Sequence, residues 1–329
     1  MSRDPLPQIG MMMHMEPAAG EPIPAFFAQR AAHVAALEAL GVDAVWVTEH
    51  HFDPRSLSAS PLLLLAQWAA RTQRIHLGVA AVLAAGRNPA LLAEDIALLS
   101  NLAPGRIALG FAKGGPFEAQ SRAFGWGSEQ ARQEMLAVVD AVRHHLLGQG
   151  SAAAPLQPPL QPPLPLFIAS RDPDALAWAA ARGIGWMSAQ FWSLDMYDAQ
   201  AINWSIAAQH PQPDALLVRG LWLDDDADAA RDHALRWLHT FRASKEAQWK
   251  VGFRGPLAEL DETDSLQRMI VGTPAQCAAQ LGALLATRRV PRLAFNPMHP
   301  EPQQQLAQMR RLLHEVLPAV TAAATSPCA

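Results

Sequence analysis

The sequence predicts an α/β fold, a (β/α)8 or TIM barrel that occupies residues 1–329 as a single domain. The first observation is a regular alternation, in which segments patterned like buried strands and segments patterned like helices follow one another eight times. The second is a shared helix start, in which a capping side chain precedes a proline at the first helical position. This signal occurs at Ser60-Pro61, Asn88-Pro89, Asp172-Pro173 and Thr273-Pro274. The rival fold, a doubly wound open sheet, usually carries Gly-x-Gly-x-x-Gly after its first strand, and the sequence lacks that fingerprint.

Each predicted strand is a short apolar run bounded by turn residues. The eight strands are expected at Ile9–His14, Val45–Val47, Ile75–Leu83, Arg106–Ala112, Leu166–Ala169, Ile184–Ala189, Ala215–Leu223 and Arg292–Asn296. The clearest helices between them are expected at Pro24–Leu40, Leu62–Arg71, Ser128–Leu147, Asp195–Gln209, Asp226–Phe241 and Gln303–Val316. A further helix begins at the capping box Thr273-Pro274-Ala275-Gln276.

Two stretches interrupt the rhythm. Residues 155–165 carry six prolines, which suits either a linker between domains or an extended lead-in to a strand. Because the alternation resumes unchanged after them, we interpret them as a surface loop within one domain. Residues 243–270 match neither a strand nor a helix well, and we expect an insertion loop there that acts as a lid over the barrel mouth.

Composition narrows the class of protein. Half of the residues are hydrophobic and the formal net charge is −4, so the chain can bury a large core and offers no basic surface for nucleic acid. No apolar run approaches the roughly 20 residues that span a bilayer. We therefore expect a cytoplasmic protein with no membrane or nucleic-acid partner. The two cysteines, Cys277 and Cys328, are expected to be reduced thiols.

Three consecutive ionisable residues follow the second predicted strand and are candidates for a catalytic site. The apolar run Val45–Val47 is followed by Glu49, His50 and His51. In a barrel, active sites lie at the carboxyl ends of the strands. Because successive side chains of a strand point to opposite faces, Glu49 and His51 should project one way and His50 the other. One of the two histidines is therefore expected to face the central cavity.

Cations and helix starts converge at the same end of the barrel. Lys113 follows the fourth strand with two glycines behind it, and Arg132 lies in the first turns of the next helix. Ser170 and Arg171 precede the helix that Asp172 caps. Cations and helix N-termini together suit a phosphate monoester. The alternative that Lys113 and Arg132 are solvated surface charges stays open on this pattern alone.

Two other chemistries find little support. A metal-dependent hydrolase on a barrel commonly uses a His-x-His pair, and none of the twelve histidines has that spacing. No metal site is predicted. Nucleophilic hydrolysis lacks a Gly-x-Ser-x-Gly elbow, and neither cysteine has a base nearby in the sequence.

The chain resembles the bacterial luciferase-like, flavin-dependent monooxygenase family, most specifically from Gly41 to Gly148. The motifs that carry the resemblance are Gly41-Val42-Asp43, Glu49-His50-His51-Phe52, Ile75-His76-Leu77-Gly78-Val79-Ala80-Ala81, Asn88-Pro89 through Ala93-Glu94-Asp95, Pro104-Gly105-Arg106 and Ser121-Arg122-Ala123-Phe124-Gly125. Beyond Gly148 the match is looser, although Leu166 to Arg182 and the stretch from Val271-Gly272-Thr273-Pro274 up to Asn296-Pro297 also fit.

This resemblance implies a barrel that binds reduced FMN at the strand ends, reacts it with O2 and shields the C4a-hydroperoxide from water. It implies that His50 is the catalytic histidine and that Lys113 and Arg132 bind the phosphate, with Ser170 and Arg171 as further contacts. It also implies a non-prolyl cis peptide at Ala80-Ala81 beneath the flavin, and a homodimer in which Glu94 is buried at the interface. Bacterial luciferase has a reactive cysteine where this chain has Ala112, which weakens any expectation of light emission.

The expected function is a two-component monooxygenase that oxygenates a small apolar aldehyde or ketone. Eight βα units leave no room for a dinucleotide-binding module, so we expect a separate NAD(P)H-dependent flavin reductase to supply the reduced FMN. Three alternatives stay open: F420-dependent hydride transfer on the same fold, a non-catalytic flavin-binding protein, and, with least support, a metal-dependent hydrolase.

Overall fold

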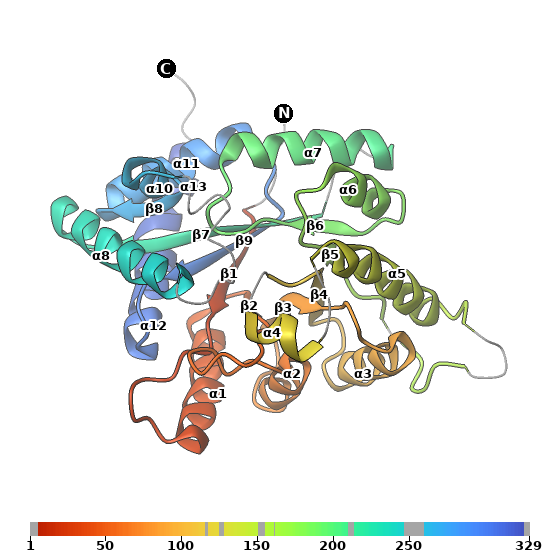
Figure 1. Cartoon of the computed structure of the whole chain (residues 1–329). Coiled ribbons are helices and arrows are strands. Elements are labelled where there is room, and N and C mark those ends of the chain that lie inside the picture. Colours follow the sequence, from red (N-terminus) through yellow and green to blue (C-terminus); the bar gives the residue numbers. More distant parts are fainter. Residues whose placement is uncertain are drawn as a thin grey trace.

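The computed structural model describes residues 6–115, 118–124, 128–150, 155–160, 162–209, 214–246 and 260–325. Eight parallel strands form a closed ring, which confirms the predicted TIM barrel (Figure 1). In ring order they are β1 (Gln8–Met13), β2 (Ala44–Val47), β3 (His76–Leu83), β4 (Ile107–Ala112), β5 (Leu166–Ile168), β6 (Gly185–Met187), β7 (Ala215–Leu223) and β9 (Arg292–Pro297). The ring closes where β9 pairs with both β7 and β1.

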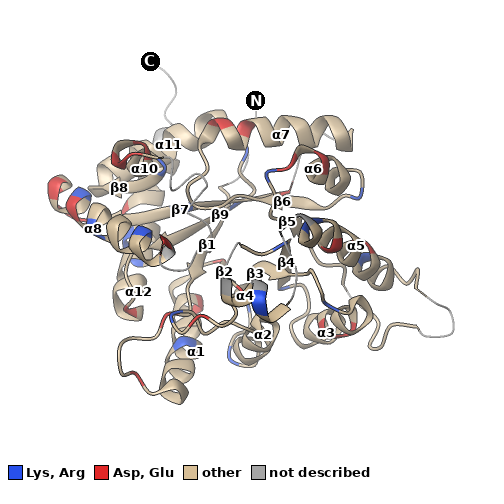
Figure 2. Cartoon of the chain, in the orientation of Figure 1, with Lys and Arg blue, Asp and Glu red and all other residues tan. Residues whose placement is uncertain are grey.

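Helices surround the ring (Figure 1). Those of the first half are α1 (Ile23–Leu40), α2 (Pro61–Ala69), α3 (Pro89–Leu102), α4 (Glu118–Phe124) and α5 (Ser128–Leu146). Those of the second half are α6 (Pro173–Ala180), α7 (Leu194–Ala208), α8 (Ala227–Glu246), α10 (Glu262–Gln267), α11 (Pro274–Thr287), α12 (Pro302–Arg311), the π-helical turn η1 (Leu312–Val316) and α13 (Leu317–Thr325). None of these helices is long and apolar enough to cross a membrane. Figure 2 shows acidic and basic residues interspersed, mainly on the outer helices and loops.

The predicted bounds of the insertion, 243–270, are wrong at both ends, because regular elements occupy its first and last residues. Helix α8 continues to Glu246, helix α10 occupies Glu262–Gln267, and a ninth strand, β8 (Met269–Gly272), follows directly. β8 pairs only with the second half of β7, so it lies beside the ring and leaves the count of barrel strands at eight. Four residues are too few for a periodic pattern to reveal. The centre of the expected lid, residues 247–259, lies outside the described residues.

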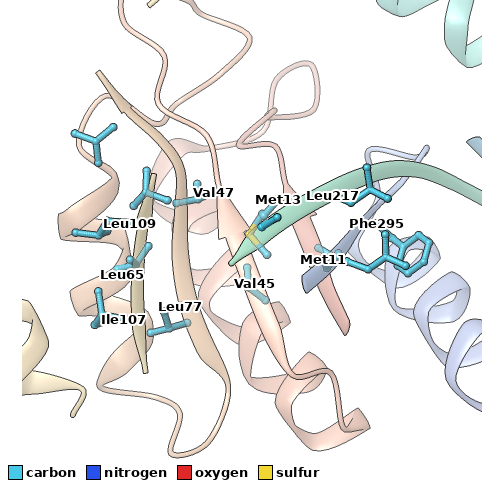
Figure 3. Close-up of a cluster of buried hydrophobic side chains, with 14 of the residues drawn as sticks. Met11, Met13, Val45, Val47, Leu65, Leu77, Ile107, Leu109, Leu217 and Phe295 are labelled. Atoms are coloured by element: carbon cyan, nitrogen blue, oxygen red, sulfur yellow. The ribbon is translucent and has the colours of Figure 1, made fainter. Parts of the chain in front are cut away.

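The alternation of side chains divides the barrel into two apolar layers. Figure 3 shows the outer layer, in which Val45 and Val47 of β2 lie with residues of the neighbouring strands and of α2. Residues at the other positions, such as Trp46, fill the interior of the ring. The interior cluster consists of Met12, Ala44, Trp46, Ala81, Ala108, Phe167, Met187, Leu216, Val218 and Ala294.

Trp46 closes the floor of the barrel. Its ring meets that of Phe167 edge to face, with centroids 5.9 Å apart. Glycines on both neighbouring strands make room for the indole: a Cβ on Gly78 would lie 2.3 Å from Trp46 Cε3, and one on Gly10 would lie 3.1 Å from Trp46 Cδ1. The space above this floor, at the carboxyl ends of the strands, is therefore open to form a cavity.

Candidate active site

A cavity of about 790 Å³ lies at the carboxyl ends of the barrel strands. Its lining comes from the ends of β1 to β7 and from helices α5 and α8. Every site residue expected from the sequence contributes to this one cavity: His50, Ala80, Ala81, Lys113, Arg132, Ser170 and Arg171. The fold thus brings together residues that are up to 121 positions apart in the chain.

The two adjacent histidines lie in different environments, as the strand alternation predicts. Thr48 and His50 continue the inward side of β2 and line the cavity. Glu49, on the opposite side, is buried, and its Oε1 lies 2.7 Å from His51 Nε2. The alternation left open which histidine faces the cavity, and the one that lines it is His50, the histidine that the family resemblance implies.

Glu49 is the centre of a network that fixes the end of β2. Its Oε1 also accepts a hydrogen bond of 2.6 Å from Arg87 Nη2, and its Oε2 accepts one of 3.1 Å from the backbone N–H of Leu83. Leu83 ends β3, so the carboxylate ties the second strand to the third. Burial makes these charge-assisted bonds stronger than they would be in water.

An aromatic cluster extends this network outwards. The His51 ring meets Phe124 of α4 edge to face, with centroids 5.0 Å apart, and Phe52 lies 5.6 Å from Phe124. Phe52 adopts a left-handed backbone conformation with φ of 55°. Such a conformation is unusual for a bulky residue.

The part of the lining that comes from the ends of β4 and β5 and from α5 carries three cations, Lys113, Arg132 and Arg171. Lys113 follows β4 beside Gly114, whose φ of 91° is readily adopted only by glycine. Arg132 of α5 donates a hydrogen bond of 2.7 Å to Asp172 Oδ2. The other oxygen of Asp172 caps α6 by accepting from the N–H groups of Asp174 and Ala175. The Arg132–Asp172 ion pair links residues 40 positions apart, and the sequence analysis missed it.

The wall formed by β6, β7 and α8 is mainly apolar. Its members are Met187, Phe191, Trp192, Val218 and Phe241. Gln190 adds one amide to this wall, and its Oε1 accepts a hydrogen bond of 2.8 Å from Asn296 Nδ2. Across the ring, the Ala80–Ala81 peptide bond is cis, as the family resemblance implies, and Ala112 lies nearby on the lining.

Several lining residues escaped the sequence analysis: Glu16, Asp53, Arg55, Ser56 and Ser244. The first four lie in loops after β1 and β2, and Ser244 lies on the part of α8 that was assigned to the insertion. No local motif marks such positions.

The described residues offer little support for a metal site or for a cysteine nucleophile. Among the described residues, no group of three or more His, Cys, Asp or Glu side chains is arranged to hold a metal ion. Cys277 is buried, and burial raises the pKa of its thiol to about 12, so it stays protonated at neutral pH. Cys328 lies outside the described residues.

Comparison with known proteins identifies the family. Residues 8–290 match the family model of luciferase-like monooxygenases. The chain belongs to this family. The match confirms the resemblance inferred from the motifs, and the family is one of oxidoreductases.

Members that resemble the chain differ in their cofactor. The chain is 29% identical over 157 residues to the oxygenase component of a flavin-dependent trigonelline monooxygenase from Acinetobacter baylyi, covering 44% of this chain and 43% of that protein. It is 30% identical over 180 residues to an F420-dependent glucose-6-phosphate dehydrogenase from Kineococcus radiotolerans, covering 49% of this chain and 52% of that protein. The matched regions thus span about half the length of these relatives.

The solved structure of the oxygenating constituent of 3,6-diketocamphane monooxygenase from Pseudomonas putida, in complex with FMN, superimposes with a TM-score of 0.73. The superposition covers 94% of this chain and 98% of that one. At 16% identity this similarity establishes the shared fold alone.

Proposed function

We propose that the protein is the oxygenase component of a two-component flavin monooxygenase that uses reduced FMN and O2 to oxygenate a small apolar aldehyde or ketone. The observation that carries the proposal is a cavity whose lining combines cations at the ends of β4 and β5, an apolar wall and His50. Two similar proteins, an oxygenase component of a flavin-dependent monooxygenase and an oxygenating constituent in complex with FMN, support it.

The cavity fits a phosphate-bearing flavin. Its volume of about 790 Å³ falls in the range of roughly 300 to 1,000 Å³ that is typical of small-molecule sites. In the part of the lining that comes from the ends of β4 and β5 and from α5, Lys113, Arg132 and Arg171 carry three positive charges and Asp172 carries one negative charge. Two positive charges remain in excess, which matches a phosphate dianion.

Each group of residues then has a defined task. Lys113, Arg132, Ser170 and Arg171 hold the phosphate, and Ala80 and Ala81 support the flavin ring. The bound reduced flavin supplies the electrons that activate O2. The wall around Phe191 and Trp192 excludes water and receives the apolar substrate.

His50 is the proposed catalytic residue. With an ordinary imidazole pKa of about 6.5, a histidine can accept or donate a proton at a ring nitrogen near neutral pH. Its place on the inward side of β2 brings the ring to the cavity, beside Thr48. The buried Glu49 on the other side holds the strand end that carries it.

The proposal includes two protein partners. A separate NAD(P)H-dependent flavin reductase supplies the reduced FMN. A second copy of the chain covers α3, where Leu91, Leu98 and Leu102 are exposed together with Glu94. A row of exposed leucines on one helix is typical of a face that another protein covers.

F420-dependent hydride transfer is the second candidate. Its support is the similarity to the F420-dependent glucose-6-phosphate dehydrogenase from Kineococcus radiotolerans. F420 carries a longer, anionic tail beyond its phosphate, so the two cofactors are separable by direct titration of the purified protein.

The test is spectroscopic. Purified protein is mixed with photoreduced FMN under argon and then with air-saturated buffer, and absorption is followed from 300 to 500 nm. We expect a transient band that belongs to neither reduced nor oxidised FMN and that outlasts any such band in buffer alone. Reoxidation at the rate of free flavin, together with tight binding of F420, would replace the proposal by the hydride-transfer function.

A further inference from the structure

One hydroxyl in the lining of the cavity has no hydrogen-bond partner among the described residues. It belongs to Thr48, which lies on the inward side of β2, two residues before His50. Its Oγ1 is covered by the surrounding atoms. Covered polar atoms in native proteins almost always have a partner, because an unpaired one loses its bonds to water without a replacement. An unpaired hydroxyl inside a cavity is therefore a candidate ligand contact.

The lining holds a second covered polar atom of this kind, but it belongs to a side chain that is fixed in place. Gln190 Nε2 has no partner in the described part of the chain, whereas Oε1 of the same amide accepts a hydrogen bond from Asn296. The Nε2 atom lies against the backbone of Gly220, where a Cβ would be only 2.9 Å away. The Gln190 amide is thus held against β7 and β9. The Thr48 hydroxyl is not held by any bond to the described chain.

The Thr48 hydroxyl can reach the cavity by a rotation of its own side chain. The residue as a whole is partly exposed, although its Oγ1 is covered. Oγ1 and the methyl group occupy staggered positions on Cβ, so a rotation of χ1 by about 120° exchanges them. The backbone does not have to move. A hydroxyl can both donate and accept a hydrogen bond, so it suits either kind of polar atom on a ligand.

The neighbours of Thr48 indicate which part of a flavin it meets. The register of β2 with β1 and β3 places Thr48 between His14 and Ala80, and all three residues line the cavity. Ala80 and Ala81 are the proposed support of the flavin ring, and Trp46 closes the apolar floor below them. The cations proposed to hold the phosphate come from the ends of β4 and β5 and from α5. Thr48 is therefore expected to meet the ring and not the phosphate.

We propose that Thr48 is a cofactor-binding residue whose hydroxyl forms a hydrogen bond with a nitrogen or oxygen on the edge of the flavin ring. This inference rests on the proposed function, because it takes the ligand to be a flavin. It adds a contact to the ring to the contacts proposed for the phosphate. Loss of this bond should weaken every ligand that carries the ring, with or without a phosphate.

The test is Thr48→Val, which replaces the hydroxyl by a methyl group of similar size. Reduced FMN and reduced riboflavin are titrated into the protein by anaerobic calorimetry. Both Kd values should rise by about three- to tenfold, the usual effect of one lost hydrogen bond. Thr48→Ser keeps the hydroxyl and should stay within about twofold of the wild type. Without flavin, Thr48→Val should melt at the wild-type temperature or above it, since the hydroxyl that it loses is bonded to no described residue.

Thr72→Val is the matched control, because it removes the same atom from a hydroxyl that has partners. Thr72 Oγ1 donates a hydrogen bond of 2.8 Å to the carbonyl of Trp68 and accepts one of 3.0 Å from Arg106 Nη1. Thr72 lies between α2 and the amino end of β3, away from the cavity lining. This variant should lower the melting temperature and leave both Kd values within about twofold. The two valine variants thus separate a ligand contact from a structural hydroxyl.

Unchanged Kd values in Thr48→Val would overturn the inference. A loss confined to FMN would also overturn it, because it would place Thr48 at the phosphate. A lower melting temperature of flavin-free Thr48→Val that Thr48→Ser restores would assign the hydroxyl a structural role instead. Failure of the proposed function has a different signature: the wild type would bind both flavins without forming the transient band, and Thr48→Val would still bind them less tightly.

Discussion

The two sides of the β2 end differ in burial and in hydrogen bonding. On the inward side, Thr48 and His50 line an open cavity. On the outward side, Glu49 is buried and bonded to His51, Arg87 and the backbone of Leu83. The inward side lines the cavity in which we propose that the flavin binds, and the outward side ties β2 to β3. Two histidines one residue apart thus have different tasks because a strand turns its side chains to opposite faces.

The largest expected effect is a loss of oxygenation rate, caused by a substitution on the inward side of β2. His50→Ala should lower the rate of substrate oxygenation by about 10² to 10⁴, the usual cost of removing a positioned acid or base. His51→Ala should keep much of the activity and lower the melting temperature instead, because it removes one partner of Glu49. Turnover numbers and thermal unfolding of both variants give the comparison. Normal turnover in His50→Ala, or an inactive and fully folded His51→Ala, would reverse the assignment of the two sides.

The next largest effect is a loss of stability, caused by a substitution on the outward side of β2. Glu49→Ala should lower the free energy of unfolding by about 3 kcal/mol, near the low end for a broken buried ion pair because the Arg87 side chain keeps 30% exposure and can be hydrated. Glu315→Ala removes one of the two acidic partners of Arg311, in an exposed i,i+4 pair, and should cost less than about 0.5 kcal/mol. Urea denaturation measures both. Equal losses would mean that the outward network contributes no more than a surface ion pair.

The third prediction concerns the affinity of the cavity for the FMN phosphate. Arg132→Ala should weaken reduced FMN at least tenfold and leave riboflavin binding nearly unchanged, since a charge-assisted bond to phosphate contributes roughly 1.5 to 3 kcal/mol. Arg143→Ala, on the same helix and away from the cavity lining, is the control. Anaerobic titration followed by flavin fluorescence measures Kd. A similar loss for FMN and riboflavin would place Arg132 away from the phosphate.

The smallest expected effect on turnover comes from a substitution at the proposed dimer interface. Leu98→Asp should convert the proposed dimer to monomers, because a carboxylate on α3 would be buried without a partner at the interface. Turnover per chain should change less than in any cavity variant. Sedimentation velocity gives the oligomeric state, with Ile206→Asp, at an exposed apolar side chain of α7, as the control. A wild-type monomer, or a dimer that is unaffected by Leu98→Asp, would rule out the α3 interface.

Much of the fold could be predicted because the signals are local. Each barrel strand carries its own apolar run, and the paired cap and proline mark helix starts such as Asn88-Pro89, where Asn88 accepts from the N–H groups of Ala90 and Leu91. The alternation rule was enough to place His50 and His51 on opposite sides of the strand end, and the family resemblance indicated His50 as the inward one. Strand β8 was missed because four residues, partnered by one half of β7, carry no period of their own.

The rest of the site depends on tertiary contacts. The Arg132–Asp172 pair and the Gln190–Asn296 bond join residues 40 and 106 positions apart, and nothing in either local sequence marks them. Phe241 looks like an ordinary helix residue until α8 is placed beside the barrel mouth. A sequence can thus indicate which residues reach the rim, whereas the neighbours that tune them emerge only from the packed structure.

The most direct test of the central claim is protection of the two histidines from diethylpyrocarbonate, measured by peptide mass spectrometry with and without saturating FMN. We expect FMN to slow the modification of His50 at least fivefold and to leave the slow modification of His51, which is bonded to Glu49, unchanged. Modification of His50 at the same rate with and without FMN would contradict the claim that the inward side of β2 faces the flavin.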